Sequence, residues 1–127
     1  MSKAEYTITL DTERCIVLVA AHGDLPKELG EEVITRALTT AAGHQYPIFC
    51  DVRHAEVNVS LADWFFLPRT LAILRDAKMR AIKTAILISP GSHERTYGFY
   101  ETVTHNLGMS LKIFLDEKKA LEWLKEN

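Results

Sequence analysis

The hydrophobic positions of this chain fall into short runs that are separated by longer helical patterns. Residues 6–10 alternate strictly between apolar and polar side chains, which predicts a strand with one buried face. The polar turn 11–14 is too short for a parallel crossover, so this strand and the next should form an antiparallel hairpin. Four later runs are almost continuously apolar, as in parallel strands covered on both faces: 15–21, 47–52, 84–89 and 111–115.

Helical spacing of apolar residues appears in four stretches. The first begins at Pro26, and the second begins at Ser60 and contains Pro68, which predicts a kink or two short helices. The third begins near Ser92, and the fourth follows Asp116 as its N-cap. The order β-β-α-β-α-β-α-β-α predicts an α/β fold with a mostly parallel five-stranded sheet and an antiparallel first strand. We expect residues 1–127 to form a single domain.

Composition and charge argue against several classes of protein. The 127 residues include 15 Lys and Arg against 17 Asp and Glu, a net charge of −2, so the chain lacks the positive excess of a nucleic-acid binder. The longest apolar run, 15–21, is too short to span a bilayer, and no leader pattern opens the chain. Cys15 and Cys50 both lie in apolar runs. Reduced core thiols in a cytoplasmic protein are the simpler interpretation, and a bridge between them stays open.

Two stretches resemble a known group of proteins. The strand end 49–53, Phe-Cys-Asp-Val-Arg, and the ending 113–124, together with the strand order, look like the small SpoIIAA-like (STAS/CRAL-TRIO-like) domains of bacteria. The resemblance covers nearly the whole chain. It implies a β-α superhelix with one antiparallel strand added at its start. Many members of this group have no established biochemical activity.

The resemblance also points to one residue. In anti-sigma-factor antagonists of this kind, a phosphorylatable serine opens the second main helix, within an Asp-Ser-Ser-Gly type motif. Ser60 stands at the corresponding place within 57–63, although the preceding aspartate, the second serine and the glycine are absent. The resemblance therefore implies Ser60 as a candidate phospho-acceptor.

Three histidines should lie near one another. His22, His54 and His93 each follow the carboxyl end of a predicted parallel strand, and neighbouring strand ends share one edge of the sheet. Asp24, Asp51, Arg53 and Glu94 should lie at this same edge. These residue types suit acid–base work, a small ligand or a divalent ion. No short His-x-His or Glu-x-x-His spacing supports a metal site, so we predict neither a metal nor a cofactor.

The loop 89–95 could serve as an anion site. Its small residues would expose backbone N–H groups at the start of a helix, where Ser92 and Arg95 could assist. Ser92 serves equally well as an ordinary N-cap.

Catalytic signatures are lacking. Ser89 or Ser92 with His93 and Asp51 has hydrolase residue types but no G-x-S-x-G turn, and Cys50 stands mid-strand among apolar neighbours. We predict no catalytic residue, and an enzyme is the less favoured class.

A protein interface is the leading functional expectation. A right-handed superhelix places its helices mainly on one face of the sheet, yet strands 16–20 and 85–88 are apolar on both faces. A crossing helix, a second subunit or an apolar ligand should cover the other face, and we expect a homodimer, with another protein partner as the alternative. The expected contact is a run of bulky residues that cannot all face one core: Trp64, Phe65, Phe66 and Leu67.

A basic stretch follows this run. It could meet an acidic partner or be an ordinary solvated helix face, and it comprises Arg69, Arg75, Lys78, Arg80 and Lys83. We therefore expect a non-catalytic regulatory or protein-interaction domain. The alternative is a binder of a small molecule, an anion or a metal, with an enzyme included in that class, that uses the histidine-containing edge.

Overall fold

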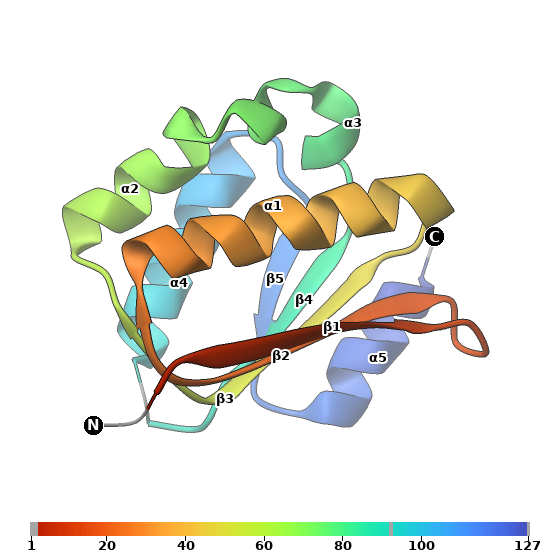
Figure 1. Cartoon of the computed structure of the whole chain (residues 1–127), viewed down its shortest axis with the longest axis horizontal. Helices are drawn as coiled ribbons and strands as arrows, with labels where there is room; N and C mark the ends of the chain where they lie inside the picture. Colours follow the sequence, from red (N-terminus) through yellow and green to blue (C-terminus); the bar gives the residue numbers. More distant parts are fainter. Residues whose placement is uncertain (1–2, 92, 127) are drawn as a thin grey trace.

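A twisted five-stranded sheet forms the centre of the molecule (Figure 1). The computed structural model describes residues 3–91 and 93–126. The strands lie in sequence order across the sheet, with β1 antiparallel to β2 and all later pairs parallel. Their bounds are β1 (Glu5–Asp11), β2 (Ile16–Pro26), β3 (Ile48–Asn58), β4 (Thr84–Leu87) and β5 (Leu111–Phe114). The predicted sheet and its antiparallel first strand are confirmed.

The helical segments lie between and after these strands: α1 (Lys27–His44), α2 (Leu61–Thr70), η1 (Ala72–Arg75), α3 (Ala77–Arg80), α4 (Glu94–Asn106) and α5 (Glu117–Lys125). The second helical stretch is broken, as the proline predicted. Pro68 lies inside α2, which ends two residues later, and η1 and α3 continue the connection. Asp116 caps α5, because its carboxylate accepts a hydrogen bond from the N–H of Lys119.

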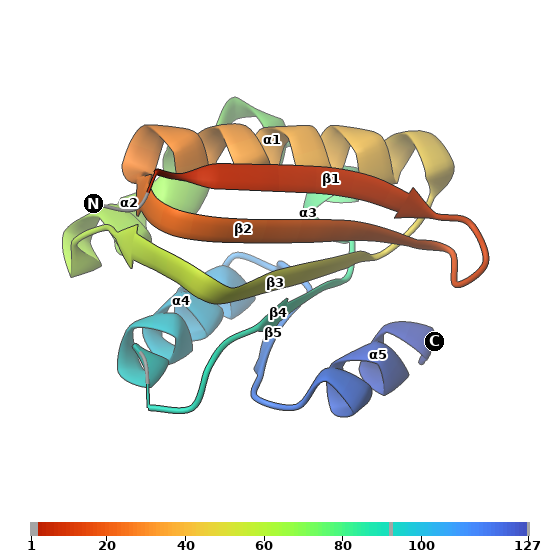
Figure 2. The same cartoon turned by 60° about the horizontal axis from the view of Figure 1, so that its bottom comes forward.

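Helices cover both faces of the sheet. On one face, α1 packs on β2 and β3, α4 packs on β5, and α2 packs against α4; together they form the main core, which includes Val19, Trp64 and Tyr100. On the other face lies α5 (Figure 2), which packs Ala120 and Leu124 against a second apolar cluster. Of the three expected covers for the second face, the chain supplies its own crossing helix. The apolar part of the second face is thereby covered within the chain, and this argument for a homodimer falls away.

Two strands run further than their apolar runs indicate. β2 continues to Pro26 and β3 to Asn58, where inward residues such as Leu25 and Ala55 alternate with outward polar ones. This alternation is typical of strands with one covered face. A register shift accompanies it: Ala20 pairs with Asp51, whereas His22 pairs with His54. β3 thus contains one extra residue, a β-bulge, at this point.

A glycine in the extended part of β2 is required by a close backbone approach. Gly23 has φ +84, and a side chain there would overlap the carbonyl group of Lys3. β2 can therefore pass beside the start of the chain only with glycine at this position.

Candidate functional site

The outward side of β1, β2 and β3 beyond α5 is a polar surface that carries most of the predicted site residues. We call it the open face and define it by its outward side chains: Glu5, His22, Asp51, Arg53, His54 and Glu56. The strand extensions change the predicted placement of two histidines. His22 and His54 lie within β2 and β3 as paired positions, and not beyond the strand ends. That part of the sequence prediction is wrong.

Two of the three histidines are paired with carboxylates. His22 Nε2 lies 3.2 Å from Glu5 Oε2, across the β1–β2 hairpin. His93 Nε2 lies 2.7 Å from Glu56 Oε2, which joins the start of α4 to the end of β3. The imidazoles therefore contact separate glutamates and do not converge on one point. Within residues 3–91 and 93–126, no three His, Cys, Asp or Glu side chains are grouped so that they could hold a metal ion.

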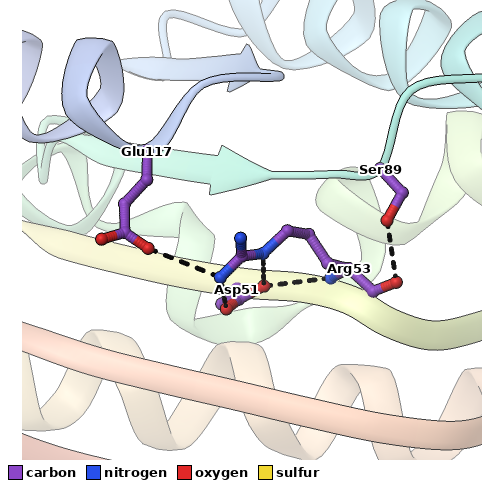
Figure 3. Close-up of polar contacts among 4 residues, drawn as sticks. All are labelled: Asp51, Arg53, Ser89 and Glu117. Carbon is purple, nitrogen blue, oxygen red and sulfur yellow. Dashed lines mark hydrogen bonds and ion pairs between the residues drawn. The ribbon is translucent and has the colours of Figure 1, made fainter.

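Asp51 and Arg53 form a two-pronged ion pair (Figure 3). Arg53 Nε donates to Asp51 Oδ1 at 3.0 Å and Nη2 donates to Oδ2 at 2.8 Å, while the Arg53 backbone N–H donates to Oδ1 at 3.1 Å. The same Nη2 lies 3.4 Å from Glu117 at the start of α5. Ser89 Oγ donates to the Arg53 carbonyl at 3.0 Å. This network connects β3, α5 and the segment after β4, so its first role is structural.

The ion pair changes the acidity of its carboxylate. Burial alone would raise the pKa of Asp51, but the hydrogen bonds from Arg53 and the positive charge of its guanidinium hold that pKa below its usual value of 3.8. The same pairing raises the pKa of Arg53. Both groups are therefore charged at neutral pH and occupied by one another.

The loop before α4 is arranged differently from the predicted anion site. Glu94 Oε2 accepts a hydrogen bond from the Gly91 N–H at 3.0 Å, so a carboxylate of the chain takes this donor. His93 is the residue before the helix and has φ 58, in the left-handed region. Arg95 is exposed and Asp24 is half-buried. Ser92 lies outside the described residues.

The two cysteines have different environments. Both are free. Cys50 packs beside the main core, where burial and then the nearby charge of Asp51 raise the pKa of its thiol to about 12. This thiol is protonated at neutral pH and a poor nucleophile. Cys15 was expected in the core, but it is exposed with φ 55 and ends the β1–β2 turn, and β2 begins one residue later.

The predicted aromatic contact divides between core and surface. Trp64 and Leu67 are 6% and 3% exposed and pack in the chain's own core, so their prediction as interface residues is wrong. Phe65 and Phe66 are 39% and 55% exposed, because four consecutive positions of a helix span all its sides. Leu61, 57% exposed, was missed; it lies one helical turn before Phe65.

The two exposed aromatic rings of α2 contact one another, and one of them also contacts an arginine. Their centroids are 5.2 Å apart with the planes nearly perpendicular. The Arg69 guanidinium lies 3.8 Å from the centroid of the Phe65 ring, and its Nη1 donates to the Phe65 carbonyl at 2.6 Å. We call Leu61, Phe65, Phe66 and Arg69 the α2 surface.

The basic residues between positions 69 and 83 differ in their contacts. Arg80 donates to the carbonyls of Leu74 and Arg75, and Lys83 Nζ donates to the carbonyls of Trp123 and Glu126 in α5 and its cap. Arg75 and Lys78 are exposed. Arg69, Arg75 and Arg80 surround a shallow depression of about 300 Å³, whose apolar lining includes Leu74 and Met109. A depression with this lining suits a carboxylate attached to an apolar group.

Ser60 is the N-cap of α2. Its Oγ accepts a hydrogen bond from the Asp63 N–H at 3.1 Å, and the residue is exposed. A capping role is therefore evident from geometry, and modification of this hydroxyl would act at the positive end of the helix.

Strand order, the added antiparallel strand and helices on both faces define an α/β domain of SpoIIAA-like fold. The chain is similar to the crystal structure of an uncharacterised DUF3478-family protein with a SpoIIAA-like fold from Shewanella loihica PV-4. The two share 21% identity and a TM-score of 0.56 over 98% of this chain and 95% of the other. The predicted resemblance is thereby confirmed for the fold. No protein-family model and no curated protein matches the chain.

In the described part of the chain, no helix has the length and apolar character needed to cross a membrane.

Proposed function

We propose that this chain is a non-catalytic regulatory domain that binds another protein through the α2 surface. The observation that carries this proposal is a pair of exposed phenylalanines in mutual contact, on a helix whose opposite side is anchored in the core by Trp64 and Leu67. Burial of one phenylalanine side chain contributes about 1.5–3 kcal/mol. Rings that are already held by neighbours lose little side-chain freedom on binding.

The charge beside the aromatic pair indicates the chemistry of the partner. Arg69 belongs to the α2 surface and also lines the depression formed with Arg75 and Arg80. A partner segment with aspartate or glutamate next to apolar side chains would fit both parts. A two-fold homodimer through this surface would bring two arginine-bearing patches together, which disfavours self-association. An acidic protein other than a second copy is thus the favoured partner.

Two further points support a regulatory rather than an enzymatic role. The acidic and imidazole groups of the open face are largely paired with one another, and the Cys50 thiol is protonated and packed beside the core. Two free thiols support a reducing compartment, so we place the protein in the cytoplasm. Ligand binding on the open face is the competing function, with His22, His54 and His93 as its central residues.

Selection of peptides tests the proposal while the partner is still unidentified. A displayed library of random peptides is selected on the wild-type protein, and affinities of the enriched peptides are measured by fluorescence anisotropy. We expect enrichment of acidic residues beside apolar ones. We also expect at least a tenfold loss of affinity with Phe66→Ser, and binding that weakens as salt rises.

A matched control separates this surface from general stickiness. Leu115 is 50% exposed and lies between β5 and α5, so Leu115→Ser removes a comparable apolar side chain elsewhere and should leave affinity unchanged. Binding that survives Phe66→Ser but is lost on joint replacement of the three histidines by alanine would move the function to the open face. A dimer in light scattering that Phe66→Ser dissolves would identify a second copy as the occupant and contradict the proposed partner.

A further inference from the structure

The depression beside the α2 surface lies where the broken connection between β3 and β4 meets the end of α4 (Figure 1). Its volume is about 300 Å³. The floor is apolar, and its residues are buried or half-buried: Pro68, Leu71, Leu74, Leu107 and Met109. Arg69, Arg75 and Arg80 form the rim, and none of the described residues that line the depression is acidic. The site therefore combines an apolar floor with a positively charged rim.

The three rim arginines form no ion pair with a carboxylate in the part of the chain that the structure describes. Arg69 Nη1 instead donates to the Phe65 carbonyl, and Arg80 Nη1 donates to two main-chain carbonyls of the segments before it. These bonds use one nitrogen of each guanidinium and leave its other donors for a further acceptor. A guanidinium presents paired donors whose geometry matches a carboxylate. The rim thus offers carboxylate-binding groups that no described acid of the chain occupies.

We propose that this depression binds a small organic acid, whose carboxylate contacts the rim arginines while a compact apolar body covers the floor. The volume of about 300 Å³ is roughly twice that of an apolar cavity that accommodates benzene, about 150 Å³. A body of one ring with a short stem to the carboxylate therefore fits. The site itself is argued from the depression alone. Only its effect on partner binding rests on the proposed function of the α2 surface.

The apolar floor favours a carboxylate over a phosphate. A carboxylate carries one negative charge at neutral pH, whereas a phosphate monoester carries about −1.5 to −2. Charge placed beside apolar side chains loses part of its hydration, so the doubly charged group loses more. The side chains of the floor supply no hydrogen-bond donor in compensation. The ligand class is thus a monocarboxylic acid rather than a phosphate ester.

Binding of the acid should compete with the proposed acidic partner. Arg69 belongs both to the α2 surface and to the rim of the depression. A carboxylate bound at Arg69 would neutralise a charge that the partner's own acidic residue is proposed to use. The organic acid would therefore weaken partner binding and act as a small-molecule signal that releases the partner.

Three probe molecules test the two halves of the ligand. Cyclohexylacetate has the carboxylate and the apolar body, cyclohexylethanol lacks the charge, and acetate lacks the body. Binding is followed by ¹³C–¹H NMR of the methionine methyl groups, because Met109 lines the depression and Met79 in α3 does not. We expect a saturable shift of Met109 with cyclohexylacetate, at least tenfold weaker binding of the other two probes, and a much smaller shift of Met79. Binding of cyclohexylacetate should weaken as salt rises.

Two variants with the same change of charge supply the structural control. Arg75 is exposed on the rim, so Arg75→Gln should keep the fold and reduce the affinity for cyclohexylacetate at least fivefold. Lys78 is exposed three residues further along and does not line the depression, so Lys78→Gln should bind within twofold of the wild type. Urea denaturation checks that both variants are folded.

The contrary outcomes for the site do not involve the partner. Equal binding of cyclohexylacetate and cyclohexylethanol would overturn the role of the arginines, and tighter binding of cyclohexylmethyl phosphate would overturn the choice of a carboxylate. An equal loss of affinity in Arg75→Gln and Lys78→Gln would reduce the site to general positive charge. Competition is measured separately, with a peptide selected on the wild-type protein: saturating cyclohexylacetate should lower its affinity at least threefold. An unchanged peptide affinity would overturn the release of the partner, whatever the result at the site.

Discussion

At the scale of single residues, Arg53 on the open face contacts side chains of two different elements. Positions i and i+2 of a strand point to the same side, so Asp51 and Arg53 meet on β3 and form two parallel hydrogen bonds. Glu117 then extends the pair to α5. Because Arg53 contacts groups on two elements, its side chain holds the uncovered half of the sheet to the half that α5 covers.

The Asp51–Arg53 pair predicts a pH-dependent stability. The pKa of Asp51 is lower in the folded protein than its usual value of 3.8, so the pair stabilises the fold above that value. The contribution is lost as pH falls through the lowered pKa. Asp51→Asn should therefore reduce the free energy of unfolding by about 0.5–1 kcal/mol at neutral pH, the range of partly exposed ion pairs. This deficit should shrink below about pH 4. Urea denaturation of both proteins from neutral pH to about pH 3 measures it.

A double-variant cycle controls this prediction. With Arg53→Gln already in place, Asp51→Asn should cost much less, since its main partner is gone. A deficit that stays constant from neutral to acidic pH would show that Asp51 acts through packing rather than charge.

The carboxylate partners of the histidines could not be predicted from the sequence. The sequence predicted that His22 and His54 follow the ends of neighbouring strands, whereas they pair with one another within β2 and β3, and their carboxylate partners depend on strand register. In the hairpin, Glu5 faces His22 because Asp11 faces Ile16 across a turn of four residues. The expected turn 11–14 pairs residue 10 with residue 15, a register that does not align Glu5 with His22. The Glu56–His93 contact joins residues 37 apart in sequence and has no local signal.

At the scale of elements, the strands could be predicted where helices cover both faces of the sheet. They could not be predicted where helices cover only one face. Residues 16–20 and 48–50 lie under helices on both sides and read as continuous apolar runs. Beyond them, outward polar residues such as His54 resemble a loop when the sequence is scanned for such runs. The bulge in β3 makes this part of the strand still harder to recognise, because one extra residue interrupts the alternation of inward and outward side chains.

The prediction at this scale concerns the stability that the N-cap residue of α2 provides. Ser60 Oγ accepts from the Asp63 N–H, so Ser60→Ala should lower the free energy of unfolding by about 1 kcal/mol. Ser60→Asp should retain the wild-type stability, because aspartate caps equally well and its charge suits the helix N-terminus. Thermal and urea denaturation of the three proteins provide the measurement.

The same two variants separate a capping role from a switch. If Ser60 is a phospho-acceptor, Ser60→Asp should also change the affinity of peptides selected on the wild-type protein, while its stability stays the same. Unchanged affinity would leave Ser60 as a cap only. A stability loss in Ser60→Asp equal to that of Ser60→Ala would contradict the capping geometry.

At the scale of the whole molecule, α5 covers the second apolar face of the central strands. The sequence showed that both faces of the central strands are apolar, and it could not show which element would cover the second one. α5 packs Ala120 and Leu124 on Ile16, Phe49 and Leu87, opposite the α1 layer (Figure 2). Lys83 holds the end of this helix through backbone carbonyls of Trp123 and Glu126. The final helix thus provides the cover that a dimer partner would otherwise have to supply.

Displacement of α5 should expose an apolar face of the sheet and promote self-association. Leu124 is 6% exposed in the second apolar cluster, so Leu124→Asp would place a charge among apolar side chains and prevent the helix from docking. The uncovered face should then self-associate, giving a larger mass in light scattering and binding of a hydrophobic dye. Lys118→Asp introduces the same residue on the exposed side of the same helix and should behave as the wild type. A Leu124→Asp protein that keeps its circular-dichroism spectrum, stays monomeric and binds no dye would show that α5 is not what protects this face.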